Sequence, residues 1–140
     1  MVRFFRRTVL VLSSMLLLMS QTAATAQPNE MIVRVSEIEI DPNYLEEYKA
    51  ILKEEAEASV RLEPGVMSIF PMHEKEHPTR VRILEIYASR EAYESHLKTA
   101  HFQRYKATTQ NMVKLLKLVD MEAIDTETMT KIFRKTKMAR

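Results

Sequence analysis

Two histidines with the potential for chemistry, His96 and His101, lie five residues apart in the segment EIYASREAYESHLKTAHFQRY, which spans residues 85–105. On one continuous helix a spacing of five corresponds to about 140° of rotation, so the two imidazoles would not bind one metal ion. A break is expected at Lys98–Ala100, where Thr99 resembles a second helix cap. With that break, both imidazoles can face the space between the helices and a sheet. From spacing alone, a packed and hydrogen-bonded His96 and a His101 at a helix cap remain an open alternative.

The segment His73-Glu-Lys-Glu-His77 matches the H-E-x-x-H pattern of zinc proteases letter for letter. That chemistry needs a helix, which places both histidines on one face and the glutamate beside the metal-bound water. Here Pro71 and Pro78 flank the pattern, and the residues on either side alternate as strands do. A hairpin loop therefore explains the segment better than a zinc site.

The first 26 residues have the pattern of a secretory signal peptide. Arg3, Arg6 and Arg7 precede an apolar run from Thr8 to Met19, and small residues stand at Ala24 and Ala26. The apolar run is shorter than the ~20 residues of a membrane-spanning helix, so cleavage after Ala26 is favoured over a membrane anchor. We therefore expect a periplasmic or secreted protein without stable membrane insertion after cleavage.

The charge and cysteine content of the remaining chain exclude several classes. The sequence has 21 Lys and Arg against 19 Asp and Glu, and residues 1–26 hold three of the arginines and no acid. The exported part is therefore close to neutral, and nothing in it favours a nucleic-acid partner. The sequence has no cysteine, which excludes disulfides and a lipid anchor on a cleavage-site cysteine.

Hydrophobic periodicity divides residues 27–124 into the elements of one α+β domain. The order is strand, helix, two strands, two helices and strand, which is the ferredoxin-like βαββαβ plan: an antiparallel sheet with helices on one face. Gly65, the one glycine of the chain, is expected at a turn position with positive φ. Residues 125–140 form a polar, basic extension with a short helix through Met129, Ile132 and Phe133. The patterns predict strands at 31–40, 66–72, 80–87 and 114–124, and helices at 43–63, 90–98 and about 100–112.

Several motifs in order carry a family resemblance. The segment from His96 to Tyr105, HLKTAHFQRY, resembles the His-Leu-x-Thr-x-His-x-x-x-Tyr segment of the antibiotic biosynthesis monooxygenase (ABM) domains, which include bacterial quinol monooxygenases. Ser36-Glu-Ile38, Glu63-Pro-Gly65 and Glu85 are similar to the family's first-strand pattern, its turn before the second strand and its third-strand acid. The likeness covers about residues 31–124.

The resemblance implies a homodimer that pairs sheet to sheet as a dimeric α+β barrel, with a pocket between sheet and helices in each protomer. It also implies oxidation of a small phenol or hydroquinone by O₂ without a metal, a flavin or any other cofactor. The protein then has to bind an apolar ring, hold a base near its hydroxyl and stabilise the anion.

The same resemblance implies the site residues. His96 is expected as the base or as an orienting group, Glu85 to converge on it, and Arg82 to stabilise the oxyanion if its strand face points into the pocket. Candidate substrate-binding residues are Phe70, Tyr87, His101, Phe102 and Tyr105.

Two other functions remain open. A branch of the same fold isomerises a phosphorylated signalling-sugar derivative and has a similar His-x-x-Thr-x-His segment. A non-catalytic dimer that binds a small hydrophobic molecule would instead enclose His96 fully in apolar side chains. The chain has no tryptophan, and its first strand has no asparagine, which weighs against the aromatic-polyketide and haem-degrading branches.

Overall fold

The computed structural model describes residues 30–129, 131 and 132. The first strand, Ile32–Ile40, lies in a four-stranded sheet, and buried residues alternate with partly exposed ones from Ser36 to Ile40. Residues 1–26, expected as a signal peptide, and Phe133 of the expected C-terminal helix lie outside the described residues. Within the described range no helix is long and apolar enough to cross a membrane. The elements are β1 (Ile32–Ile40), α1 (Leu45–Leu62), β2 (Val66–His73), β3 (Arg80–Tyr87), α2 (Arg90–His96), α3 (Ala100–Thr109) and β4 (Val113–Met121), with a 3-10 turn, η1 (Pro42–Tyr44), before α1.

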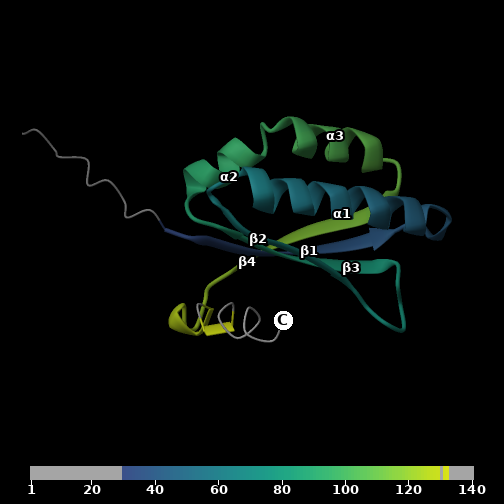
Figure 1. Ribbon diagram of the computed structural model, residues 1–140. Helices are drawn as coiled ribbons and strands as arrows, with labels where there is room; N and C mark the ends of the chain where they lie inside the picture. The colour runs from purple at the N-terminus through teal and green to yellow at the C-terminus, as the bar shows by residue number, and fades with distance from the viewer. Residues whose placement is uncertain (1–29, 130, 133–140) are drawn as a thin grey trace, which may run out of the picture.

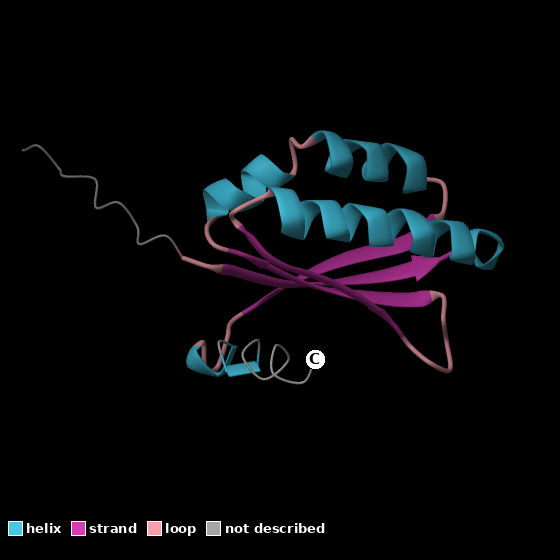
Figure 2. Cartoon of the chain, in the orientation of Figure 1, coloured by secondary structure: helices cyan, strands magenta, loops and turns pink. Residues whose placement is uncertain are grey.

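The strands are arranged in the order β2-β3-β1-β4, and all neighbours are antiparallel. All three helices cover one face of this sheet (Figures 1 and 2). This is the ferredoxin-like α+β plan predicted from the sequence, with every predicted strand and helix present. Residues 127–129, 131 and 132 are helical and lie on the other side of the sheet.

Short polar side chains begin the helices where the sequence indicated. The Asp41 carboxylate accepts the Asn43 backbone N–H at the start of η1, and Pro42 follows it. The Ser89 and Thr99 hydroxyls accept backbone N–H groups at the starts of α2 and α3. The Thr99 cap falls between α2 and α3, so the break predicted near Lys98–Ala100 is confirmed.

The core lies between the sheet and the helix layer. Ile38 and Ile40 of β1, Val81 and Ile83 of β3 and Leu52 of α1 are all buried there. Burial of such side chains stabilises the domain by about 1.5–3 kcal/mol each. The core therefore fixes which face of each strand the helices see, and with it which polar residues can reach the space beneath them.

Gly65 has a different role from the one predicted. Its φ is not positive, so the turn does not need glycine for its backbone conformation. A Cβ placed on Gly65 would instead lie 2.5 Å from the Cβ of Ala92 in α2. Glycine is needed because the start of β2 passes this close to a neighbouring helix.

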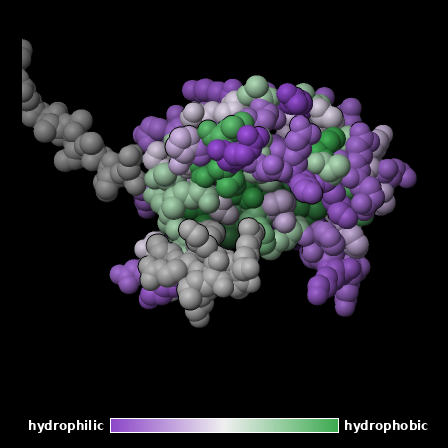
Figure 3. All heavy atoms as spheres, in the orientation of Figure 1, coloured by the Kyte–Doolittle hydropathy of each residue, from purple (hydrophilic) through white to green (hydrophobic). Residues whose placement is uncertain are grey.

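The H-E-x-x-H segment lies in the β2–β3 hairpin, as predicted. His73 ends β2, and residues 74–79 form the loop before β3. Figure 3 shows hydrophilic side chains gathered over this hairpin at the lower right. The segment lacks the helix on which zinc proteases place their ligands, so it is not such a site.

The sheet face away from the helices is rich in apolar side chains. Phe70 and Met72 of β2 lie on this face and are exposed. They pair with Leu84 and Arg82 of β3. In Figure 3 hydrophobic residues also reach the surface at the level of the sheet, below the hydrophilic helices. Exposed apolar side chains gathered on one face are typical of a surface that contacts another molecule.

Candidate functional site

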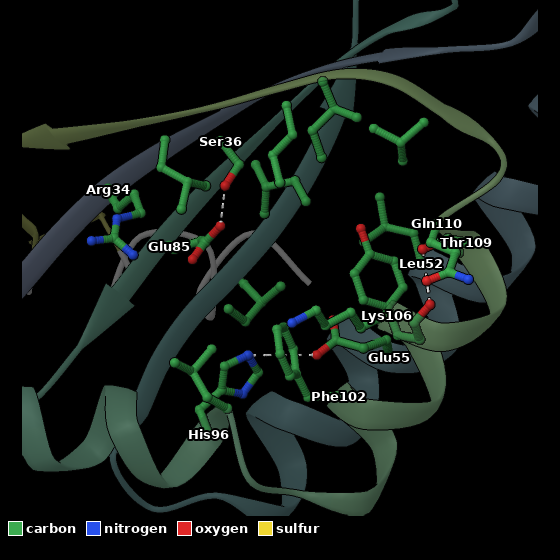
Figure 4. Close-up of a pocket in the computed structure, with 18 of the residues that line it drawn as sticks. Arg34, Ser36, Leu52, Glu55, Glu85, His96, Phe102, Lys106, Thr109 and Gln110 are labelled. Carbon is green, nitrogen blue, oxygen red and sulfur yellow. Dashed lines mark hydrogen bonds and ion pairs between the residues drawn. The ribbon is translucent and has the colours of Figure 1, made fainter.

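A cavity of about 650 Å³ lies between the sheet and the helices. That volume is within the range of small-molecule pockets. Figure 4 shows side chains from β1, β3 and all three helices pointing into it. Its walls are mostly apolar, with polar groups gathered on the sheet side and on the helix side. The lining residues include Arg34, Ser36, Ile38, Leu52, Glu55, Ile69, Ile83, Glu85, Tyr87, Tyr93, His96, Phe102, Gln103, Tyr105, Lys106 and Thr109, with Leu116 and Leu118 of β4.

On the helix side, His96 stands among carboxylates. Its side chain is only 3% exposed, its Nδ1 lies 3.0 Å from Glu63 Oε1, and its Nε2 lies 3.8 Å from Glu55 Oε1. The same Glu63 oxygen lies 2.5 Å from His101 Nε2. The Phe102 and Tyr87 rings pack against the imidazole, with centroids 4.7 and 5.4 Å away. His96 is therefore a polar group held in a fixed position on the helix side of the cavity, between carboxylates and aromatic rings.

Glu55 is buried on the pocket face of α1 and accepts a hydrogen bond of 2.7 Å from the Ser59 hydroxyl. Burial raises the pKa of the Glu55 carboxyl, while the Ser59 hydrogen bond and the nearby His96 and His101 act to lower it. A protonated Glu55 can donate a hydrogen bond into the cavity, and an ionised one can only accept.

On the sheet side, Glu85 is the central polar group. Its carboxylate accepts hydrogen bonds from the Ser36 hydroxyl and, at 2.9 Å, from the Tyr87 hydroxyl. Burial raises the pKa of the Tyr87 phenol, and the adjacent Glu85 charge adds to this. Tyr87 therefore stays protonated at neutral pH and serves as a donor that holds Glu85 in place.

Arg34 supplies a positive charge beside this cluster. Its guanidinium donates to Asp120 Oδ1 at 2.7 Å and lies 4.7 Å from the centre of the Tyr93 ring. The side chain is 12% exposed, whereas that of Asp120 is 75% exposed. Arg34 is thus fixed in position by a surface carboxylate and an aromatic face, with its charge at the pocket wall.

Five of the residues named from the sequence do line the cavity: His96, Glu85, Tyr87, Phe102 and Tyr105. They come from β3, α2 and α3. The Ser89 and Thr99 caps fix where α2 and α3 begin. The structure brings them together, and their roles in a reaction remain predictions.

Arg82, Phe70 and His101 are not among the lining residues. Arg82 points to the opposite sheet face, where it donates to Glu74 at 3.2 Å and to the Val81 carbonyl. The condition set for its oxyanion role therefore fails. Phe70 is on that same face and is 58% exposed, so it is no pocket wall. His101 shares the Glu63 carboxylate oxygen with the pocket residue His96, and the centroids of the two imidazole rings lie 6.4 Å apart.

Sequence reasoning missed several residues of the site. The sequence analysis predicts no role in the site for Arg34, gives Ser36 only as part of the first-strand motif, and gives Glu63 only as part of a turn. Glu55 was missed although the spacing of Tyr48, Leu52, Glu55 and Ser59, four, three and four residues, marks one helix face. All four of these α1 residues are buried.

The described residues contain one group able to hold a metal ion. Glu55, His96 and His101 each place a ligand atom within 4.8 Å of the others. Imidazole and carboxylate ligands suit zinc and other first-row transition metals. The Glu63 contacts, however, occupy one ring nitrogen of each histidine.

Comparison with known proteins places this architecture among characterised folds. The family model described as "antibiotic biosynthesis monooxygenase" matches residues 31–108. No curated protein matches the chain. A crystal structure from Bacteroides thetaiotaomicron, of a protein assigned to the same monooxygenases, is 52% identical with a TM-score of 0.68, over 69% of this chain and 91% of that one.

Two further solved structures are more distant. A protein from Lactobacillus acidophilus assigned as a monooxygenase is 29% identical, with a TM-score of 0.65, over 69% of this chain and 46% of that one. A protein from Nitrosomonas europaea assigned to the antibiotic biosynthesis monooxygenases is 24% identical, with a TM-score of 0.65, over 71% and 96%. The latter likeness supports the fold alone.

Proposed function

Because the chain belongs to the antibiotic biosynthesis monooxygenase family, we propose that it is a monooxygenase that oxidises a small phenol or hydroquinone with O₂ without a metal or flavin. One oxygen atom enters the ring and the other leaves as water. A hydroquinone thus gives a hydroxyquinone and water, and the substrate supplies all the electrons. The protein has to remove a phenolic proton, because the anion is the form that gives an electron to O₂ readily.

The observation that carries the proposal is His96 at the wall of an apolar cavity. The cavity of about 650 Å³ has room for a substituted aromatic ring. His96 offers a base suited to neutral pH, and the Phe102 ring beside it, 4.7 Å between centroids, forms a flat apolar wall. A ring bound there would place its hydroxyl against the Nε2 edge of His96.

The developing phenolate needs positive charge or donors. Arg34 replaces Arg82 in this role, because it lines the cavity and Arg82 does not. The Glu85 group on the same wall accepts hydrogen bonds, so it fits a second hydroxyl of the substrate. This favours a dihydroxylated ring over a simple phenol.

The geometry favours catalysis over passive binding. A non-catalytic binder would enclose His96 in apolar side chains, whereas here Glu63 bonds Nδ1 and Glu55 faces Nε2. Isomerisation of a phosphorylated sugar derivative is the competing activity in this fold. It would have to use the cations at the cavity, Arg34, Lys106 and Lys114.

We further propose that the protein works as an exported homodimer. The signal-peptide pattern of residues 1–26 supports export. The exposed apolar residues on the open sheet face, Phe70 and Met72 among them, support pairing of two sheets.

The test is oxygen consumption by residues 27–140 with a panel of substituted hydroquinones, in the presence of a chelator. We expect turnover in the wild type and a loss of about 10²–10⁴-fold in His96→Gln, which removes the base but keeps a polar side chain of similar length. His77→Gln in the exposed hairpin loop is the matched control and should retain full activity. No turnover with any hydroquinone, but conversion of a phosphorylated hydroxyketone, would replace the proposal with the isomerase.

A further inference from the structure

One carboxylate oxygen joins the two histidines. Glu63 Oε1 lies 3.0 Å from His96 Nδ1 and 2.5 Å from His101 Nε2. Glu63 directly follows α1, His96 ends α2, and His101 lies in the first turn of α3. The Glu63 side chain is 12% exposed, and that of His101 is 20% exposed. Three helices thus contribute to one largely buried group.

This arrangement determines where the His96 proton sits. A carboxylate oxygen only accepts hydrogen bonds, so each imidazole must present an N–H to it. His96 then carries its hydrogen on Nδ1 in the neutral form and keeps the lone pair on Nε2. Nε2 is the nitrogen on the side of Glu55, and both residues line the cavity (Figure 4).

Nε2 has no competing hydrogen-bond partner among the described residues. Its distance of 3.8 Å to Glu55 Oε1 is too long for a hydrogen bond. Glu55 Oε1 is itself engaged by the Ser59 hydroxyl at 2.7 Å. The lone pair of Nε2 is therefore available to a group that enters the cavity.

We propose that Glu63 is a positioning residue of the reaction, which holds His96 in the Nδ1–H tautomer so that Nε2 takes the substrate proton. This inference rests on the proposed monooxygenase function. In the step, the substrate O–H bond breaks, an Nε2–H bond forms, and the electron pair stays on the phenolate oxygen. The imidazolium that results keeps its Nδ1–H on the Glu63 carboxylate, which stabilises the new positive charge.

His101 supports this role from the other side. Its hydrogen bond to the same oxygen restrains the Glu63 side chain, and the Thr99 cap fixes the start of α3 on which His101 lies. Glu63 also stands immediately after α1, where the Glu63 backbone N–H bonds the Ser59 carbonyl at 3.1 Å. The carboxylate and the backbone of Glu63 are therefore both held in place, as is required of a residue that positions a catalytic group.

The competing use of these side chains is metal binding by Glu55, His96 and His101. That use requires both imidazoles to present lone pairs to one ion. The Glu63 contacts engage only one nitrogen of each imidazole, and a carboxylate on the other ring nitrogen is also common behind metal-bound histidines. The two uses are separated by turnover: a base at His96 Nε2 acts in the presence of a chelator, whereas a metal site needs the ion.

The experiment combines imidazole ¹⁵N NMR with steady-state kinetics on the wild type, Glu63→Gln, Glu63→Asp and Glu57→Gln. Wild-type His96 should show the Nδ1–H tautomer, and Glu63→Gln a mixture of tautomers. In Glu63→Gln we expect kcat to fall at least about tenfold, less than loss of the base itself, with KM within about twofold. Glu63→Asp keeps a carboxylate and should retain the wild-type tautomer. Glu57→Gln changes an exposed carboxylate of α1, the helix that Glu63 follows, and should change neither readout.

Three results would overturn the proposal. These are a wild-type His96 in the Nε2–H tautomer, an unchanged tautomer and kcat in Glu63→Gln, or turnover that a chelator abolishes and micromolar Zn²⁺ restores. An inactive wild type with the expected tautomer would count against the proposed function instead, because the NMR result does not depend on turnover. The two failures are therefore distinguishable.

Discussion

The hydroxyls of Tyr48 and Tyr105 lie 2.7 Å apart and join α1 to α3 above the sheet. Tyr48 is completely buried, and Tyr105 also lines the cavity. Burial raises the pKa of both phenols, that of Tyr105 to about 12, so both remain neutral at physiological pH. This neutral pair joins the two helices that carry Glu55 and Phe102, both of which lie close to the proposed base, His96.

Removing both hydroxyls of this pair should cost less stability than the two single losses added together. Tyr105→Phe leaves the Tyr48 hydroxyl buried without its partner, and we expect a loss of about 1–3 kcal/mol in the free energy of unfolding. The double variant Tyr48→Phe/Tyr105→Phe should be less destabilised than the sum of the two single variants. Urea unfolding of all four proteins measures this coupling. Costs that simply add would show that the hydrogen bond contributes nothing.

Periodicity was sufficient to predict the fold because the buried faces are regular. The predicted and observed ends of an element differ where its last residues bond to backbone groups that are distant in the sequence. The helix expected to reach residue 112 ends at Thr109, and the Met112 carbonyl accepts the Asp41 backbone N–H at 2.8 Å. The strand expected to reach residue 124 ends at Met121, which pairs with Val33 near the start of β1. No local pattern carries information about such partners.

The site was only partly predictable, for reasons of the same kind. Arg82 and Glu85 are three residues apart on one strand, so period two places them on opposite faces, and only one could reach the pocket. Val81 and Ile83 are buried beneath the helices, so Glu85, on the same strand face, is the residue that points to the pocket. The contact of Glu63 with His96 spans 33 residues. It depends on how α1 and α2 end next to one another, which spacing does not encode.

Gly65→Ala should destabilise the domain through a steric clash, since the φ of Gly65 is not positive. The new Cβ would lie 2.5 Å from the Cβ of Ala92, and we expect a loss of about 1–3 kcal/mol. Ala92→Gly removes the opposing atom, although a glycine in a helix costs about 1 kcal/mol by itself. The double variant should therefore be more stable than the sum of the single costs predicts. Additive losses in thermal or urea unfolding would contradict this account.

Glu55→Gln should change how stability depends on pH. Because burial raises the pKa of Glu55 above its ordinary value of 4.5, the folded state binds this proton more tightly than the unfolded chain does. The stabilisation that the bound Glu55 proton contributes to the free energy of unfolding is therefore complete below about pH 4.5. It is lost as the pH rises through the folded-state pKa. His96, His101 and Glu63 face Glu55 from α2, α3 and the end of α1, and they are present in both proteins.

The quantity to measure is the difference in the free energy of unfolding between Glu55→Gln and the wild type, from pH 4 to pH 8. The variant should gain stability relative to the wild type as the pH rises. Glu57→Gln, at an exposed position on the same helix, should give a difference that does not change with pH. A flat difference for Glu55→Gln as well would mean that Glu55 titrates alike in both states.

Phe70→Glu should convert the proposed dimer into a monomer. Phe70 is 58% exposed on the open sheet face, and a charge placed between two apolar sheets would be costly to desolvate. Leu62→Glu introduces the same charge at an equally exposed leucine at the end of α1, and it should leave the mass unchanged. Light scattering after size exclusion gives the mass directly. A dimer that survives Phe70→Glu would place the interface elsewhere.

Arg34→Gln should lower turnover strongly, and Arg82→Gln should leave it nearly unchanged. Arg34 lines the cavity with its guanidinium fixed by Asp120, so its loss removes charge stabilisation of the phenolate. We expect kcat/KM to fall by about 10²–10³-fold, the effect of deleting one donor to a developing oxyanion. Arg82 bonds Glu74 on the opposite face, so Arg82→Gln should keep kcat/KM within about twofold of the wild type. Equal losses in the two variants would show that the charge acts through stability or long-range potential, and that Arg34 has no direct contact with the substrate.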